Sequence, residues 1–284
     1  MVKYDPPVVS FAIFAPSRLR GEVFRMISFT SAELNAWIAA FVFPLARILT
    51  LLAAAPPFNN AGLPTRVRLA LGLALTMVIS PALPPMPPIE PTSAVGVLIL
   101  AQQMIIGLAM GFVLRLVFSA IDLAGTMIST QMGLGFATAY DPQTTSQTPV
   151  VAELIGMLAI LVFLAIDGHL MVLATLVRSF TELPVGTWTI SEASWLNIAN
   201  AGGVIFASGV MLALPAVVAL LVTNVALGVL GRVAPQLNLI VIGFPITIFL
   251  GFIALYVGMS HLVAPLRQLF EHGLQSMLGF FVLR

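Results

Sequence analysis

The segment VGVLILAQQMIIGLAMGFVL, residues 95–114, is twenty residues long and contains no Asp, Glu, Lys or Arg. An α-helix rises about 1.5 Å per residue, so roughly 20 apolar residues span the hydrocarbon core of a bilayer. The segment therefore predicts a membrane-spanning helix. Gly107 and Gly111 stand four residues apart within it, and this spacing of small residues lets a second helix approach closely.

Five further apolar runs of comparable length surround this segment, which itself continues to Ala124. They are Leu34–Ala55, Val67–Leu83, Val150–Leu176, Ile205–Leu230 and Leu239–Leu262. Several connections between the runs are short and contain proline, asparagine and glycine, which favours helical hairpins. The sequence thus predicts an all-α membrane protein built from helical hairpins, with about six long apolar helices.

The composition supports this fold class and excludes several function classes. Hydrophobic residues make up 60% of the 284 residues and charged residues 8%, with a mean hydropathy of +1.08, whereas about 25% of a soluble domain is charged. The net charge is +1 and the Lys and Arg residues are scattered, so there is no basic patch for nucleic acid. The chain has no cysteine, which excludes disulfides, zinc–thiolate sites, iron–sulfur clusters and cysteine nucleophiles.

Ionisable residues interrupt or border the apolar runs, among them Arg47, Asp122, Glu153, Asp167 and Arg232. A charge inside a membrane is costly unless it faces protein or water. We therefore expect these helices to pack against many other helices. For Arg47 and Arg232 we expect pairing with an acid or with the carbonyls at a helix C-terminus.

No motif of a known catalytic site is present: the sequence lacks a P-loop, an HExxH pair and a GxSxG elbow. Gly133 and Gly135 match only the first two glycines of a dinucleotide fingerprint, and no strand precedes them. Asp167 and His169 are able in principle to share a proton relay. Without a nearby nucleophile or metal cluster, we favour a structural role for both. We predict that the protein is not an enzyme and has no catalytic, cofactor-binding or metal site.

The two ends of the chain differ from the apolar runs. Residues 1–25 contain one Lys, three Arg and three Pro. We interpret them as an extension, either disordered or upstream of the true start at Met26, before a single domain of residues 26–284. Residues 265–284 alternate polar and apolar groups with helical spacing, which predicts an amphipathic helix for the membrane interface or for a partner.

A polar loop containing two glycines separates the third and fourth apolar runs. It reads QMGLGFATAYDPQTTSQTP, residues 131–149. Gly133 and Gly135 permit backbone torsions that other residues avoid, and Met132, Phe136 and Tyr140 are its bulky residues. The residues alone predict a mobile polar loop among apolar helices.

Short motifs follow one another in a defined order from about Met26 to the tail. They are Pro44–Arg47, Pro64–Gly72, Leu123–Gly125, Gln131–Ala137, Asp141–Pro142, Gly168–Leu170, Ala213–Pro215, Arg232–Asn238 and Gly243–Pro245. Their order and spacing resemble the FliR/SctT family of type III protein export gates, and the pattern leans toward the flagellar members. Two features depart from the family pattern. Residues 1–25 have no counterpart, and Asp167 stands where the family usually has Asn.

The resemblance implies a FliP-like part followed by a FliQ-like part, in an assembly with FliP and FliQ homologues that FlhB and FlhA homologues join. It also implies a place in the flagellar basal body at the bacterial inner membrane, and a pore that passes unfolded flagellar proteins. The central loop resembles the plug of that pore, with Met132, Gly133, Gly135, Phe136, Tyr140, Asp141 and Pro142. Structural or partner-contacting roles are expected for Arg47, Asp122, Glu153, Asp167, His169, Arg232, Pro235, Gln236 and Asn238.

Other functions remain open at this point. An injectisome gate subunit of the SctT type would show most of the same motifs. A small-solute secondary transporter would also use broken helices and an intramembrane carboxylate such as Asp167, although the two halves show no inverted repeat. A purely structural membrane scaffold is a third class. A transporter would bind or move a small ligand alone, whereas a gate subunit needs FliP and FliQ homologues.

Overall fold

The computed structural model describes residues 31–59, 62–87, 89–135, 149–186, 192–236 and 239–279, and every regular element in these ranges is a helix. The elements are α1 Ser31–Ala54, α2 Thr65–Ile79, η1 Ser80–Ala82, α3 Ala94–Gln131, α5 Val150–Ala165, α6 Gly168–Glu182, α7 Glu192–Val233 and α8 Leu239–Gly279. Five helices are long and apolar enough to cross a membrane, or six when the bent pair α5 and α6 counts as one span. The predicted all-α membrane protein is confirmed. The predicted extension, residues 1–25, lies outside the described residues.

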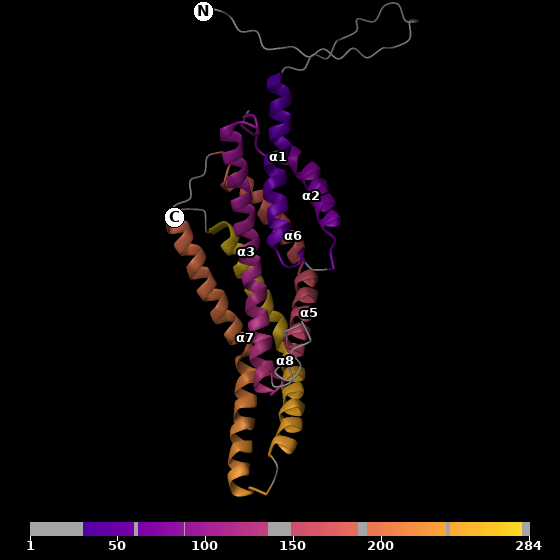
Figure 1. Ribbon diagram of the computed structural model, residues 1–284, viewed down its shortest axis with the longest axis vertical. Helices are drawn as coiled ribbons and strands as arrows, with labels where there is room; N and C mark the ends of the chain where they lie inside the picture. The colour runs from indigo at the N-terminus through magenta and orange to yellow at the C-terminus, as the bar shows by residue number, and fades with distance from the viewer. Residues whose placement is uncertain are drawn as a thin grey trace, which may run out of the picture.

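Helix α3 runs along the middle of the molecule (Figure 1). The α1–α2 hairpin lies at one end of the long axis, and the turn between α7 and α8 lies at the opposite end. Helix α5 packs against α3, and α6, which follows α5 after a bend, packs against α8. Because α3 contacts α1, α5, α7 and α8, it contributes more buried apolar side chains to the core than any other helix.

The small residues of α3 allow α1 to approach it closely, as the sequence predicts. A methyl group added at Gly107 would collide with the backbone of Arg47 and the side chain of Thr50, and one added at Gly111 would collide with Ala54. Both glycines are buried. Any larger residue at these positions would therefore push the two helices apart.

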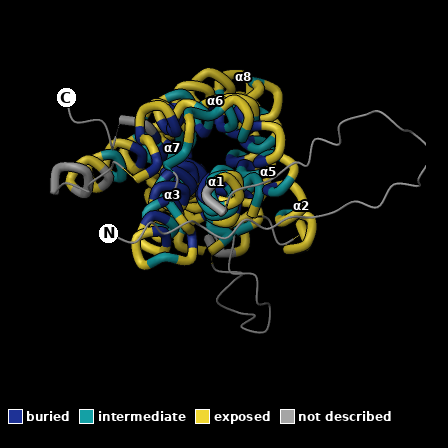
Figure 2. The backbone as a smooth tube through the Cα atoms, turned by 90° about the horizontal axis from the view of Figure 1, so that it is seen from above, coloured by how far each residue is buried: buried dark blue, intermediate teal, exposed yellow. Residues whose placement is uncertain are grey.

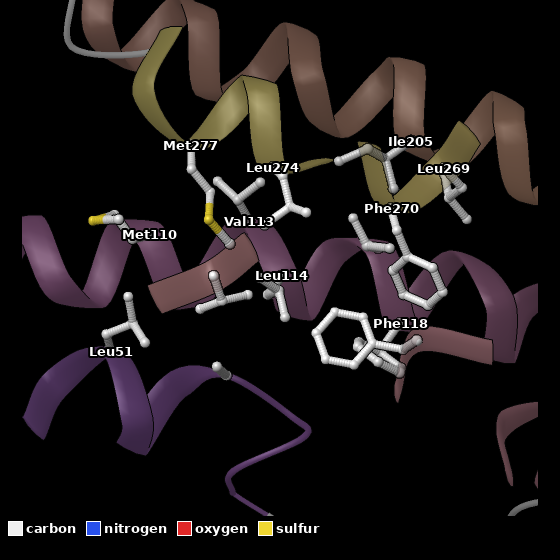
Figure 3. Packing of buried hydrophobic residues seen from close by; sticks show 14 of the residues in the cluster. Leu51, Met110, Val113, Leu114, Phe118, Ile205, Leu269, Phe270, Leu274 and Met277 are labelled. Atoms are coloured by element: carbon white, nitrogen blue, oxygen red, sulfur yellow. The ribbon is translucent and has the colours of Figure 1, made fainter. Parts of the chain in front are cut away.

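The amphipathic segment predicted at the C-terminus is helical, but it is a direct continuation of α8 through Pro265. Its apolar face packs against other helices of the same chain, chiefly α3. The expectation that this face binds the membrane interface or a partner is therefore wrong for the described residues. Five apolar residues on that face are buried: Leu266, Leu269, Phe270, Leu274 and Met277. Figure 3 shows three of them, Phe270, Leu274 and Met277, on the side of α8 that faces α3. The ring centroid of Phe270 is 5.4 Å from that of Phe118 and 5.1 Å from that of Phe163.

The outer faces of α7 and α8 are apolar and exposed. Only 22% of the most apolar stretch of each helix is buried, against 56% in α3. Figure 2, viewed along the long axis, shows the buried residues gathered on α3 and the exposed residues on the outside of the bundle. A surface this apolar requires lipid or the helices of partner subunits as its solvent.

Candidate functional site

The C-terminal end of α3 is where the chain enters the predicted plug loop, and its backbone has a defined conformation. Gly133 has a φ of +81°, in the left-handed region that favours glycine. The Gly133 N–H donates to Thr130 O at 3.0 Å, and the Leu134 N–H donates to Ser129 O at 3.1 Å. This pair of bonds is a Schellman motif. Gly133 thus terminates α3.

The two carbonyls that this motif leaves over accept hydrogen bonds from side chains of other helices. Asn224 Nδ2 on α7 donates to Gln131 O at 3.2 Å, and it also lies 3.3 Å from Gln131 Oε1. Thr247 Oγ1 on α8 donates to Met132 O at 3.1 Å and shares its proton with Phe244 O at 3.0 Å. Since a helix ends with four carbonyls that have no partner within it, the end of α3 is fully satisfied.

Apolar packing holds the same end. Met132 is fully buried, and its side chain fills the space where a Cβ on Gly251 of α8 would lie. A Cβ on Gly133 would lie 3.3 Å from the ring of Phe244. Gly135 is exposed, with open space around its Cα. Of the predicted plug residues, Met132 therefore lies in the α3–α8 contact, while Phe136, Tyr140, Asp141 and Pro142 lie outside the described residues.

Arg47 on α1 is a second predicted residue with a well-defined environment, and it is fully buried. Its guanidinium group is the centre of a cluster of hydrogen bonds. Its Nε donates to Gln103 Oε1 at 2.8 Å. Its Nη1 donates to Ser179 O at 2.9 Å and to Ser179 Oγ at 3.0 Å, and its Nη2 donates to Leu183 O at 3.0 Å. The guanidinium carbon also lies 4.1 Å from the centre of the Phe180 ring. The expected pairing with helix C-terminal carbonyls is confirmed for Arg47, since Ser179 and Leu183 lie at the end of α6.

This arrangement places the guanidinium cation of Arg47 at the C-terminal end of α6, where the helix dipole is negative. The carbonyls at the C-terminus of a helix carry a partial negative charge that stabilises cations. A guanidinium also presents five N–H groups in a fixed plane, so it can bind several carbonyl oxygens at once. Arg47 thereby joins α1, α3 and the C-terminal end of α6.

The bend between α5 and α6 contains the predicted Asp167 and His169. The two helix axes differ by 65°, and Asp167 has φ 56° and ψ 29° at the bend. Asp and Asn adopt this left-handed conformation more readily than most residues. Asp167 can therefore serve the same backbone role as the Asn that the family usually has at this position. The ring nitrogen Nδ1 of His169 is buried and has no hydrogen-bond partner within the described part of the chain. No hydrogen bond joins His169 to Asp167 there.

Asp122 and Glu153 lie on neighbouring helices. Asp122 is on the outer side of α3, where its Oδ1 lies 3.5 Å from the position of a Cβ on Gly156 of α5. Glu153 is exposed in the first turn of α5, where the positive end of the helix dipole favours a carboxylate. Both carboxylates therefore face outward from this chain.

The remaining predicted residues belong to the turn between α7 and α8. Arg232 is exposed in the last turn of α7, and Pro235 and Gln236 are exposed just beyond it. Asn238 lies outside the described residues. The structure does not bring these residues near Arg47, because the turn is at the opposite end of the molecule (Figure 1). The pairing expected for Arg232 stays a prediction. Within the described residues, no group of three His, Asp or Glu side chains is placed to hold a metal ion.

Sequence reasoning missed three residues that make these contacts: Gln103, Asn224 and Thr247. Each is a polar residue in a long apolar helix, and a polar residue in that setting is a signal in itself. A polar side chain in such a helix usually has a partner on another helix. The sequence identifies the residue that needs a partner, but it does not identify the partner.

Comparison with known proteins places the chain in a family. The model of the family described as bacterial export proteins, family 1, matches residues 38–273. The chain belongs to this family. It is 44% identical over 233 residues to the flagellar biosynthetic protein FliR of Pectobacterium carotovorum subsp. carotovorum, covering 81% of this chain and 88% of that protein. It is 40% identical over 240 residues to FliR of Escherichia coli (strain K12), covering 84% and 91%. The FliR of Bacillus subtilis (strain 168) is 27% identical over 247 residues, covering 86% and 95%.

These relatives confirm the resemblance to the FliR family. The match begins within α1, at residue 38, and ends within the C-terminal part of α8, at residue 273. It therefore includes the Arg47 cluster, the α5–α6 bend and the end of α3. The chain is a membrane protein of a family of bacterial export proteins, and its relatives are named for flagellar biosynthesis.

Proposed function

We propose that the chain is a subunit of the flagellar protein export gate in the bacterial inner membrane. In this proposal it assembles with FliP-like and FliQ-like proteins, joined by FlhB-like and FlhA-like proteins, around a pore for unfolded flagellar proteins. The observation that carries the proposal is the sequence identity to two proteins named FliR. It is 40–44% over more than four fifths of the chain. The proposed role is a structural and gating one, without a catalytic step.

A polar stripe on α3 supports the presence of water or protein beside this helix. Five polar residues lie three or four positions apart and are all exposed: Arg115, Ser119, Asp122, Thr126 and Thr130. This spacing puts them on one face. The hydroxyls of Thr126 and Thr130 bond within the helix, at 2.8 Å to the carbonyls four residues earlier. Arg115 and Asp122 are ionisable residues that are expensive to expose to lipid, so a wet pore or a partner subunit suits this face better.

The same stripe ends at the segment that we assign as the plug. Thr130 is followed by the Schellman motif at Gly133, after which the sequence continues through residues 136–148, which are polar from Gln143 onward. We place Met132 at the anchored base of the plug because it is fully buried. Gly135, Phe136, Tyr140, Asp141 and Pro142 remain the proposed plug residues beyond that base.

The exposed apolar faces of α7 and α8 support assembly with partner helices. Lipid alone would cover those faces equally well, so assembly has to be tested directly. We expect co-expression with FliP-like and FliQ-like proteins to give one stable complex, and the chain alone to be poorly stable in detergent. A monodisperse, folded monomer that binds neither protein would contradict the proposal. Transport of a small solute by the chain alone in liposomes would instead support the secondary transporter.

A further inference from the structure

We propose that α7 and α8 form a latch on the C-terminal end of α3, in which Asn224 and Thr247 are the positioning residues. The latch sets where and in which direction the chain leaves α3. This inference rests on the proposed function only in that the residues after α3 are taken to be the plug. The latch itself consists entirely of described residues: Asn224 and Thr247 as donors, Gln131 and Met132 as acceptors, and Gly251 opposite the Met132 side chain.

The first support is the distance in sequence between the bonded groups. Asn224 is 93 residues from Gln131, and Thr247 is 115 residues from Met132. One donor comes from each arm of the α7–α8 hairpin, and the two acceptors are adjacent carbonyls. Helix ends are often satisfied by water or by local turns. Here two turn bonds satisfy Ser129 O and Thr130 O, and the other hairpin supplies the remaining two donors.

The second support is the contrast between Asn224 and its neighbour Thr223. These are the polar residues in a long apolar stretch of α7. Thr223 Oγ1 donates to Ala219 O of its own helix at 3.0 Å, which satisfies the hydroxyl without any tertiary contact. The amide of Asn224 instead reaches α3. A polar side chain in an apolar helix is stabilised by a partner on another helix, and for the partly buried Asn224 that partner is the end of α3.

The third support is the packing beside the two bonds. The fully buried Met132 lies against Gly251 of α8, where even a methyl group would collide with it. The Phe244 ring lies beside Gly133. The Thr247 bond and this contact join α3 to α8, and the Asn224 bond joins α3 to α7 of the same hairpin. A shift of the hairpin along α3 therefore breaks them together. Two packed arrangements separated by such a break act as a switch, because packed interfaces do not deform continuously.

The exposed surface of α7 and α8 provides the means to move the latch. Most of the apolar surface of the hairpin is uncovered in this chain, while its inner side carries Asn224 and Thr247. A partner subunit that binds the outer face and shifts the hairpin would therefore release the end of α3. A release would free Gln131, Met132 and the residues that follow.

Hydrogen exchange in the assembled complex tests the latch without using export as the readout. The test variant is Asn224→Leu with Thr247→Val, which removes both donors at similar volume. The matched control is Thr223→Val, which removes a hydroxyl of the same hairpin that does not contact α3. We expect amide exchange in the peptide covering residues 126–135 to become about tenfold faster in the test variant, because two bonds close the end of α3. We expect no change in the control, and Thr247→Ser should retain the slow exchange of the wild type.

Two measurements separate failure of the latch from failure of the proposed function. Unchanged exchange in the double variant overturns the latch, whatever happens to secretion. Faster exchange together with a raised ion leak supports both the latch and the plug. Faster exchange with normal ion tightness and normal secretion overturns the link between the latch and the gate. If the double variant does not assemble, Thr247→Val alone serves the same comparison, with an expected increase of about threefold.

A chemical lock gives the opposite test. The chain has no cysteine of its own, so Gln131→Cys with Asn224→Cys places two reactive groups where the side chains meet at 3.3 Å. Joining them with a short bifunctional thiol reagent should stop secretion while leaving the complex assembled and ion-tight. Each single cysteine variant treated with the same reagent is the control. Secretion that continues in the cross-linked protein would overturn the latch.

Discussion

Two helix ends in this molecule are capped by side chains from other helices, and they differ in how firmly they are held. At the end of α6, the charged Arg47 is fully buried and makes four hydrogen bonds of 2.8–3.0 Å with a ring contact beside them. At the end of α3, the neutral Asn224 and Thr247 make longer bonds of 3.1–3.3 Å, and Thr247 shares its proton with its own helix.

The difference separates a fixed joint from one that is able to open. Hydrogen bonds to a charged group are stronger than neutral ones, and breaking a buried one leaves expensive unpaired groups. Two neutral bonds at a partly buried site contribute about 1 kcal/mol each. The α1–α3–α6 joint should therefore stay closed, while the α3–α7–α8 contact is weak enough for a partner subunit to break. The predictions below test that ranking.

Replacing Arg47 with Leu should have the largest effect. The change removes the guanidinium donors of the Leu183 carbonyl and the Gln103 amide oxygen, and it leaves the Ser179 carbonyl with the Leu183 N–H alone. Buried acceptors that lose their donors cost about 3–5 kcal/mol together. We expect loss of the assembled complex, measured as the yield of co-purified subunits. Arg66→Leu on the exposed surface of α2 is the control and should leave the yield unchanged. A normal yield for the Arg47 variant would remove the distinction between the two helix ends.

Replacing Gly107 with Ala should have the next largest effect. The added methyl group meets the Arg47 backbone and the Thr50 side chain, so α1 has to move and carries Arg47 with it. Overpacking of this kind costs about 1–3 kcal/mol. The control is Gly203→Ala on α7, where a Cβ meets nothing within 4 Å. The thermal unfolding midpoint in detergent should fall for the first variant and stay level or rise for the second. Equal midpoints would show that α1 and α3 are not in tight contact.

Replacing Gly133 with Ala should have an intermediate effect that is confined to the α3 end. A residue with a Cβ at a φ of +81° costs about 1–2 kcal/mol. Gly135→Ala is the control, because the space around Gly135 is open. We expect reduced secretion of flagellar proteins for Gly133→Ala, with an assembled complex in both variants. If the two variants secrete equally well, the Schellman motif has no part in gating.

Replacing Asp167 with Asn should have the smallest effect. Both residues tolerate the left-handed conformation at the α5–α6 bend, so we expect a change of less than about 0.5 kcal/mol. Asp167→Val should reduce the unfolding midpoint, because a β-branched residue strongly disfavours this conformation. A large loss of secretion in the Asn variant, with an unchanged midpoint, would show that the carboxylate has a functional role after all.

The sequence predicts the helices well because their signals are local. Each apolar run is long enough to cross a bilayer, and the spacing of Gly107 and Gly111 predicts a close helix contact, which the structure contains. The tail was harder. Its amphipathic pattern shows that one face must be covered, but it does not show that Val113 and Phe118 of the same chain cover it.

The Arg47 cluster and the end of α3 also combine a local signal that the sequence carries with distant partners that it does not identify. The charge of Arg47 within an apolar run predicts a buried partner, and the carbonyls at the end of α6 are that partner. The partners themselves are 56 and 132 residues away, at Gln103 and Ser179, and a single sequence carries no signal for those distances. The sequence predicts part of the role of Gly133, namely its unusual backbone torsions. A glycine near a helix end suggests unusual torsions, whereas its use as a helix terminator depends on the bonds of Leu134 and Thr130.

The most direct test of the export-gate account is ion permeability measured alongside secretion in a complex that lacks residues 136–148. The account places these residues in the pore as its plug, beyond the latched end of α3. It predicts that the deleted complex assembles, that ions leak through it, and that cells carrying it grow slowly. A deleted complex that stays ion-tight and secretes normally would contradict the account, and residues 131–149 would then be an ordinary connection between two helices.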